Sequence, residues 1–177
     1  IYEDDFWKKQ YDGKHGYEIL ADNTVEELKH IHAVYDLAKE QGDITDSSYE
    51  ALEKRWKDEN AERSEKVEKG EVIYGLKEYT FQLYLDYEIS TLKEKYCNDT
   101  NREGMKLTED EIQEHYQSRE WIFGDSDENA DLEMARIAVE RELREQKYDD
   151  MITQRETGSQ VAGNMENVNR ITLKNIQ

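Results

Sequence analysis

The stretch from residue 79 to residue 156 decides the fold, and its three apolar patterns read YTFQLYLDYEISTLKEKY (79–96), LTEDEIQEHY (107–116) and LEMARIAVERELREQKYDDMI (132–152). In each pattern the apolar residues recur at steps of three and four, which is the spacing of one face of an α-helix. The first and last patterns are long, the middle one is short, and a polar loop near residues 118–129 precedes the last one. This order predicts two long helices with a short helix between them.

Residues that start and stop helices punctuate the chain at regular places. Three pairs have the Ser/Thr-x-x-Glu spacing of a capping box: Thr24 with Glu27, Ser47 with Glu50, and Thr108 with Glu111. Gly42 and Gly70 follow the first two of these patterns, where a C-terminal glycine is common. Helices are therefore expected to begin at Thr24, Ser47 and Thr108, and the first two to end near the glycines.

The composition supports a helical chain. None of the 177 residues is proline, although average usage predicts roughly nine, and proline breaks helix interiors. The predicted fold class is all-α, a bundle of five to six helices, two of them long, with a short extended C-terminal tail. Residues 1–156 are expected to form the helical domain. Residues 157–177 are expected to form a polar tail, in which the alternation over residues 168–176 is typical of a short strand.

Two helical stripes contain polar residues among apolar ones. The pattern after Ser47 places Asn60 and Arg63 in line with Leu52 and Trp56. These two residues either belong to a solvated extension or pack into a polar junction, and the otherwise consistent stripe favours the junction. The next pattern places Glu88 on the stripe of Phe81, Leu85, Leu92 and Tyr96. Its apolar arc is wide, which predicts a central position in the bundle.

The charge balance excludes some partners. The chain has 43 acidic and 24 basic residues and a net charge of −19 at pH 7. Such a surface repels phosphate backbones, so nucleic acid is not an expected partner, and anionic membranes are disfavoured as well. A basic or unfolded cationic client would be attracted at long range. The simpler interpretation is that the acids keep the chain in solution. No apolar run is long enough to predict a membrane span.

Motifs that carry catalysis or bind metals are missing from the sequence. The single cysteine, Cys97, has no histidine near it in sequence to activate it. The segment from Asp125 to Asp131 resembles the start of a calcium loop, but Ala130 and Arg136 occupy its sixth and twelfth positions. An acidic loop that caps a helix is the better interpretation. We expect no catalytic residue, no metal and no cofactor, although an enzyme built from scattered acids remains an alternative.

Large apolar residues between two predicted helices provide the candidate binding site. Trp121, Ile122 and Phe123 are consecutive in the loop before the last helix. They either plug the bundle, which is the favoured interpretation, or form an exposed patch that binds peptides. Tyr84 and Tyr116 lie on helical faces, and tyrosine offers both a ring and a hydroxyl to a bound chain. These five residues are the candidate peptide-binding residues, and core packing is the default interpretation for the tyrosines as well.

The three patterns, over residues 78–92, 107–116 and 130–152, resemble the SurA-like family, the helical chaperone part of parvulin-type extracytoplasmic peptidyl-prolyl isomerases. In that family a helix of the 107–116 type precedes the parvulin domain and a helix of the 130–152 type follows it. Here only a polar loop stands at that place, so the resemblance implies no isomerase activity. The implied fold is an orthogonal bundle like the SurA N-terminal domain.

The resemblance also implies a function and a location. The function would be that of a holdase without ATP, which shields unfolded or extended polypeptides in an apolar cleft. The location would be outside the cytoplasm, secreted or anchored to the bacterial cell surface as a lipoprotein, with a signal segment upstream of this chain. The alternative is a scaffold or interaction subunit that binds one specific protein of the cell envelope.

Overall fold

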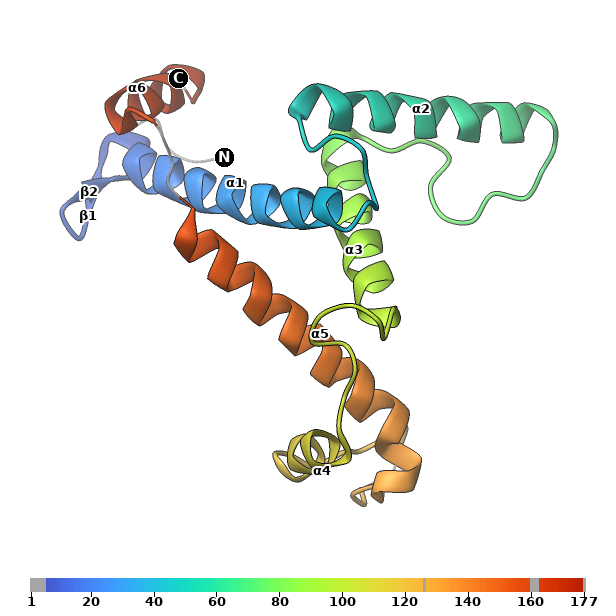
Figure 1. The fold of residues 1–177 in the computed structure, drawn as a ribbon. Coiled ribbons are helices and arrows are strands. Elements are labelled where there is room, and N and C mark those ends of the chain that lie inside the picture. The colour runs from blue at the N-terminus through green and yellow to red at the C-terminus, as the bar shows by residue number, and fades with distance from the viewer. Residues whose placement is uncertain (1–5, 126, 160–162, 177) are drawn as a thin grey trace. The chain divides into compact units, whose positions relative to one another are not determined.

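Helices dominate the structure, a computed structural model that describes residues 6–125, 127–159 and 163–176 (Figure 1). In chain order, the elements are the 3-10 turn Phe6–Lys8, strands β1 (Gln10–Tyr11) and β2 (Lys14–His15), and helices α1 (Gly16–Glu40), α2 (Tyr49–Glu68), α3 (Phe81–Asn98), α4 (Glu109–Gln117), α5 (Leu132–Gly158) and α6 (Met165–Asn175). The two strands form one short antiparallel hairpin. The predicted all-α class is confirmed, and the patterns of residues 79–96, 107–116 and 132–152 correspond to α3, α4 and α5.

The described residues form two compact units. Unit 1 joins the N-terminal residues up to Ala33 with the C-terminal residues from Gln154 onward, and unit 2 runs from Val34 to Thr153. The long helices α1 and α5 contribute to both units. The described residues of the predicted tail, 157–177, therefore group with the N-terminal hairpin and the first part of α1.

The first helix begins earlier than the sequence predicts. It starts at Gly16, directly after the hairpin, and the carboxylate of Glu18 accepts the backbone N–H of His15 at 2.7 Å. Thr24 lies inside the helix, where its hydroxyl donates to the carbonyl of Leu20 at 2.8 Å. A threonine hydroxyl can bond within the helix as well as cap it, so the predicted start at Thr24 is wrong.

The other predicted helix boundaries agree closely with the structure. Helix α2 is capped by Ser48, whose hydroxyl accepts the N–H of Ala51, so the cap lies one residue after Ser47. Gly42 and Gly70 follow α1 and α2 with φ of +75° and +70°, a conformation that glycine adopts without strain. The capping box of α4 is complete, because Thr108 accepts the N–H of Glu111 and Glu111 accepts the N–H of Thr108.

The C-terminal strand prediction is wrong, because residues 165–175 form helix α6. Asn164 caps this helix by accepting the N–H of Glu166 at 2.9 Å. The half-buried residues Met165, Val168, Thr172 and Ile176 follow one another at steps of three and four, which fits one face of a helix. A strand would need a neighbour for its backbone groups, and among the described residues the sole sheet is the two-residue hairpin.

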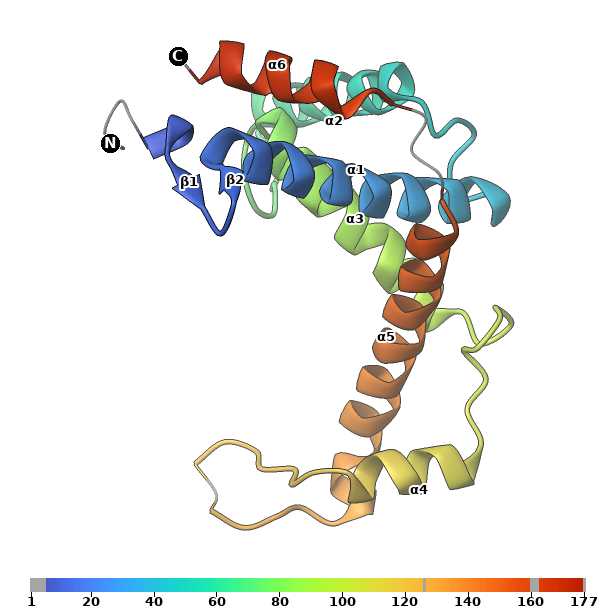
Figure 2. The same cartoon turned by 90° about the vertical axis from the view of Figure 1, so that its left-hand side faces the viewer.

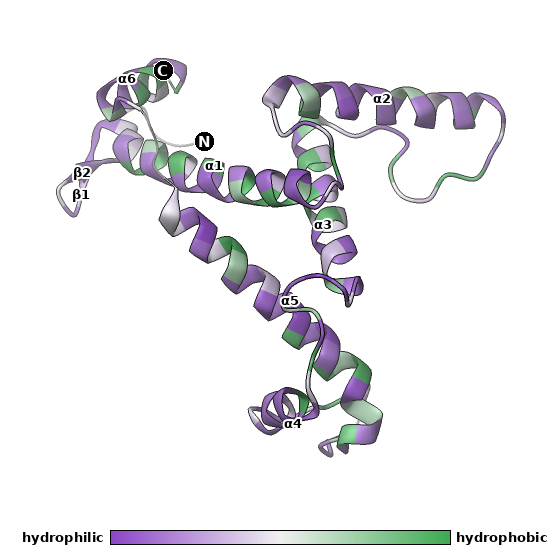
Figure 3. Ribbon diagram, in the orientation of Figure 1, coloured by the Kyte–Doolittle hydropathy of each residue, from purple (hydrophilic) through white to green (hydrophobic). Residues whose placement is uncertain are grey.

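The core of unit 2 surrounds α3, as its wide apolar arc predicts. Its buried residues include Tyr35 and Leu37 of α1, Leu52 of α2, Leu85, Leu92 and Tyr96 of α3, and Tyr148 and Ile152 of α5. The rings of Tyr96 and Tyr148 lie 5.3 Å apart between centroids, which brings α3 against α5. Helix α2 is hydrophilic along most of its length (Figure 3), and Leu52 is the residue that it buries.

The polar junction predicted on α2 is confirmed. The amide of Asn60 exchanges two hydrogen bonds with the backbone of Tyr79, at 2.9 and 2.8 Å. The guanidinium of Arg63 donates to the carbonyls of Tyr74 and Leu76 and lies 4.6 Å from the centroid of the Tyr79 ring. These contacts hold the segment between α2 and α3, residues 71–79, against the side of α2.

Candidate functional site

Trp121, the first residue of the predicted triplet 121–123, is buried in the core of unit 2. It is 3% exposed and lies in a cluster with Ile112 of α4 and with Ala135 and Val139 of α5. Its indole N–H donates to the carbonyl of Tyr116 at 3.0 Å, so the one polar atom of the ring is satisfied. Trp121 therefore fixes α4 against the first turns of α5.

The loop that follows Trp121 is closed at its base by three hydrogen bonds. The backbone N–H of Trp121 donates to the Asn129 side chain at 2.5 Å, and the Trp121 carbonyl accepts the N–H of Ala130 at 2.8 Å. The hydroxyl of Tyr116 donates to the Ala130 carbonyl at 2.8 Å. Residues 122–125 and 127–129, between these points, belong to the projecting loop, which extends beyond the ends of α4 and α5 (Figure 2). Loops with closed ends of this kind are frequently functional.

The other two predicted residues are exposed on the projecting loop. Ile122 is 50% exposed and Phe123 is 42% exposed, directly after the buried Trp121. Trp121 thus belongs to the core, whereas Ile122 and Phe123 are exposed, so each of the two interpretations holds for a part of the triplet. Gly124 follows with φ of +62°, which turns the chain at the tip of the apolar pair.

Acidic residues flank this apolar pair in the sequence. Glu120, Asp125, Asp127 and Glu128 are all exposed. The nearest basic residue in the chain, Arg119, pairs with Glu142 of α5. The projecting loop and its base therefore combine exposed apolar surface with negative charge.

The two tyrosines predicted with this site lie in different places. Tyr116 belongs to the site as a support, because its hydroxyl closes the loop and its ring packs against the Trp121 cluster. Tyr84 is 5% exposed and its hydroxyl donates to Glu88 at 2.8 Å, inside the core of unit 2. The structure thus brings Tyr116 together with Trp121 and places Tyr84 in a separate polar cluster.

That polar cluster centres on the buried carboxylate of Glu88. One oxygen accepts from the Tyr35 hydroxyl at 2.5 Å and from Arg55 at 3.1 Å, and the other accepts from Arg55 at 2.7 Å and from the Tyr84 hydroxyl. The cluster joins α1, α2 and α3. The sequence offered one signal for it, the position of Glu88 on the apolar stripe of α3, but its partners on α1 and α2 were not predicted.

The chemistry of the Glu88 cluster is structural. Burial and then the hydrogen bond with Glu88 raise the pKa values of Tyr35 and Tyr84, so both hydroxyls stay protonated and donate. Four hydrogen bonds reach the carboxylate, two of them from the Arg55 guanidinium, and they leave no free position for a substrate. A buried charge that is fully paired in this way specifies how three helices meet.

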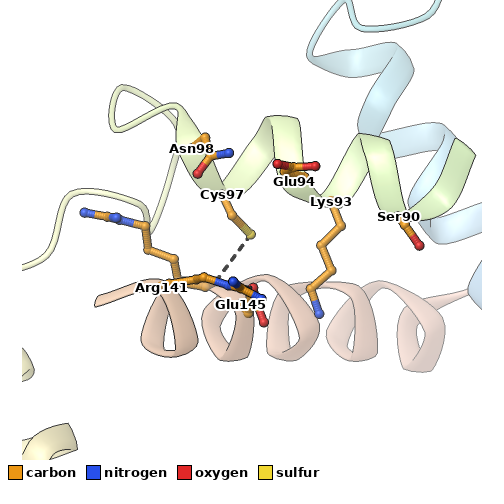
Figure 4. A pocket seen from close by; sticks show the side chains of 8 residues that line it. Ser90, Lys93, Glu94, Cys97, Asn98, Arg141 and Glu145 are labelled. Carbon is orange, nitrogen blue, oxygen red and sulfur yellow. Dashed lines mark hydrogen bonds and ion pairs between the residues drawn. The ribbon is translucent and has the colours of Figure 1, made fainter. Parts of the chain in front are cut away.

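A second feature of unit 2 is a pocket of about 450 Å³ between α3 and α5 (Figure 4). Cys97 and Lys93 line its α3 side, and Arg141 and Glu145 line its α5 side. The Cys97 thiol points to the carbonyl of Arg144 at 3.7 Å, and burial raises its pKa to about 11. A thiol with this pKa is protonated at neutral pH and is a weak nucleophile.

The last residue of the acidic run, Asp131, lies at the start of α5. Asp131 caps α5 by accepting the N–H of Met134 at 2.9 Å, so the predicted capping role is confirmed at Asp131, while Asn129 binds Trp121 instead. Among the residues that the structure describes, no group of three His, Cys, Asp or Glu side chains is arranged to hold a metal ion. None of the helices in the described ranges is both long and apolar enough to cross a membrane.

Comparison with known proteins gives one relevant similarity. The matching protein is named "Chaperone for lacto-N-biosidase" and comes from Bifidobacterium longum subsp. longum. The chain is similar to a chaperone. The two sequences are 31% identical over 152 residues, which are 86% of this chain and 54% of the relative, so the chain spans about half the length of that protein. No family model and no solved structure matches the chain.

The similarity supports the broader part of the predicted resemblance, a relation to chaperones. The relation to SurA-like and parvulin-type proteins stays a prediction.

Proposed function

We propose that this chain is a chaperone module that binds one client enzyme in a non-native state and helps it to reach its fold. The observation that carries the proposal is the similarity to a chaperone named for a single enzyme, a lacto-N-biosidase. We propose a secreted glycoside hydrolase of that class as the client. We further propose that the module works outside the cytoplasm, secreted or anchored to the cell surface, and without ATP.

Exposed apolar side chains support a role in protein binding. Beside Ile122 and Phe123, α5 exposes Ile137 at 84%. Apolar side chains that gather on a protein surface mark sites of protein association. In contrast, the buried carboxylate of Glu88 and the thiol of Cys97 are occupied in structural contacts.

The relative's name favours a dedicated client over a broad range of unfolded proteins. A general holdase needs an adaptable surface that tolerates many sequences, whereas a dedicated chaperone needs a surface with a defined shape and charge. The projecting loop has both, because three hydrogen bonds close its base and exposed acidic residues flank its two apolar residues in the sequence.

A refolding assay tests the proposal. A denatured lacto-N-biosidase is diluted into buffer with the chain at equimolar to threefold excess, and the recovered hydrolase activity is measured. A folded acidic protein of similar size serves as the control for non-specific charge effects. We expect a higher yield of active enzyme with the chain than with the acidic control. Equal yields with the two proteins would refute the proposed function.

A second client separates a dedicated chaperone from a general holdase. An unrelated aggregation-prone protein is diluted in the same way, and its light scattering is recorded. A dedicated chaperone raises the lacto-N-biosidase yield and leaves the unrelated protein to aggregate. Equal protection of both proteins would instead identify a general holdase of the predicted SurA-like kind.

A further inference from the structure

We infer that the projecting loop, with Glu120 at its base, is the docking surface for a basic segment of the client that also carries large apolar side chains. The inference rests on the proposed function and adds the place and the chemistry of client binding. It is argued from three properties of the loop: its fixed base, its exposed apolar pair and its charge.

The base of the loop is held in place before any client binds. Trp121 anchors it in the cluster with Ala135 and Val139, and the hydrogen bonds from Tyr116 and to Asn129 close its base. A surface that is already ordered loses less conformational entropy when it binds a partner. The apolar pair is thus presented on a rigid support rather than on a free chain end.

Ile122 and Phe123 supply the contact area. Both are about half exposed, although the residue before them, Trp121, is buried. The chain therefore leaves the core directly after Trp121. About half of each side chain is thus open to a partner. Burial of this apolar surface against a partner would favour binding.

The charge around the pair decides which partner fits. Within residues 118–133, six residues are acidic and Arg119, the one basic residue, already pairs with Glu142. A partner segment with Lys or Arg beside its apolar residues complements this surface, and an acidic segment is repelled. A second copy of the chain is a poor occupant, because each copy has a net charge of −19.

The other exposed apolar segment lacks this selectivity. The segment with Val72 and Tyr74, which are 76% and 86% exposed, contains two acidic residues, Glu71 and Glu78, and one basic residue, Lys77. Its net charge of −1 over residues 71–79 attracts a basic partner much less than the six acidic residues of the stretch 118–133 do. This difference makes the segment a matched control for the projecting loop, since both carry exposed apolar side chains in loops that are held by hydrogen bonds.

A binding experiment with designed peptides tests the docking surface. Three labelled peptides of equal length are compared by fluorescence anisotropy against the whole chain: one with Lys and Leu, one with Glu and Leu, and one with Lys and Ser. We expect measurable affinity for the Lys–Leu peptide and at least tenfold weaker binding of the other two. Equal binding of the Lys–Leu and Glu–Leu peptides would show that charge does not select the partner, and would overturn the inference.

Variants locate the binding on the molecule. In the double variant Ile122→Ser/Phe123→Ser we expect at least a tenfold loss of affinity for the Lys–Leu peptide. In Glu120→Gln/Asp125→Asn we expect weaker binding with a smaller dependence on salt, because fewer charges are left to attract the peptide. The control Val72→Ser/Tyr74→Ser should bind as the unchanged chain does. Circular dichroism and Trp fluorescence check that every variant keeps its fold.

The outcome distinguishes this inference from the proposed function. If the control variant loses affinity and the loop variants do not, the docking surface lies at the segment after α2 and the inference is wrong. If the loop variants still support refolding of lacto-N-biosidase as well as the unchanged chain does, the inference fails and the proposed function stands. If the chain binds the Lys–Leu peptide through the loop but never improves refolding, the proposed function fails and the basic-peptide site stands.

Discussion

Glu88 illustrates at the residue scale how a charged side chain becomes part of a core. It lies on the apolar stripe of α3 and receives hydrogen bonds from Tyr35, Arg55 and Tyr84. The sequence marks the position as unusual, since one acid interrupts a stripe of large apolar residues. The partners that make the position stable come from two other helices, and no local pattern announces them.

Removal of this carboxylate should destabilise the fold strongly. In Glu88→Ala, Arg55 loses its partner and two tyrosine hydroxyls lose their acceptor inside the core. The loss of one member of a buried ion pair typically costs 3–5 kcal/mol, and because Arg55 is one quarter exposed we expect about 3 kcal/mol. Urea denaturation measures the change. The control Asp58→Ala removes an exposed ion pair with Lys54 on α2 and should change stability little, so equal effects of both substitutions would contradict this account.

Neighbouring residues of the loop should behave in opposite ways. Trp121→Ala leaves a large cavity beside Ala135 and Val139 and should lower the free energy of unfolding by about 3 kcal/mol or more. Phe123→Ala should change stability little, because the ring is 42% exposed. Thermal or urea unfolding of both variants compares them directly. A stable Trp121→Ala variant would show that the base of the loop is not part of the core.

At the scale of elements, the connections are tied to the helices by ion pairs. Asp43, in the segment after α1, accepts two hydrogen bonds from Arg102 at 2.6 and 2.8 Å and pairs with Lys95 of α3 at 2.7 Å. The side chains of Asp43 and Arg102 are 4% and 9% exposed. Arg102 follows α3, so this contact joins the connections at the ends of two helices within unit 2.

The Asp43 contact predicts a pH dependence with a definite sign. Arg102, and then Lys95, lower the pKa of Asp43 below its usual 3.8, against the opposing effect of burial. The unfolded chain thus binds this proton at a higher pH than the folded chain, and stability rises with pH in that window. The contribution should be fully present above about pH 5 and be lost as the pH falls below 3.8.

The substitution Asp43→Asn isolates this contribution. The variant should be less stable than the unchanged chain at pH 6, and the difference should shrink as the pH falls below 4. Urea denaturation at pH 6, 4 and 3 gives the three differences, under conditions in which both proteins refold reversibly. A difference that stays constant over this range would show that the ionised carboxylate is not what stabilises the contact.

At the scale of the whole molecule, the charge of −19 should govern how fast a basic client is captured. An increase of ionic strength from 0.01 to 0.15 M shortens the Debye length from about 30 to about 8 Å. We expect the association rate with a basic client to fall several-fold over this range and the dissociation rate to change much less. Stopped-flow fluorescence measures both rates, and an association rate that is independent of salt would refute electrostatic steering.

Local patterns were sufficient for most elements of this fold. The steps of three and four in residues 79–96, 107–116 and 132–152 correspond to α3, α4 and α5, and Thr108 with Glu111 forms the predicted capping box. The interruption of the α2 stripe by Asn60 and Arg63 predicted a polar junction that the structure contains. These features depend on residues close together in the chain, whose side chains meet on the same helix or in the next connection.

Other features depended on neighbours that are distant in sequence. Thr24 has a capping signature, but α1 begins at Gly16, directly after the hairpin. Residues 168–176 alternate in the sequence as a strand would, but residues 165–175 form α6, and no neighbouring strand is present among the described residues. Burial of Trp121 and exposure of Ile122 and Phe123 are decided by the cluster from α4 and α5. The sequence by itself determined the three helices within residues 79–158, the polar junction and the negative charge, because these follow from periodicity and composition. Only the tertiary structure decided which apolar and charged residues are enclosed, because burial depends on what packs against a side chain.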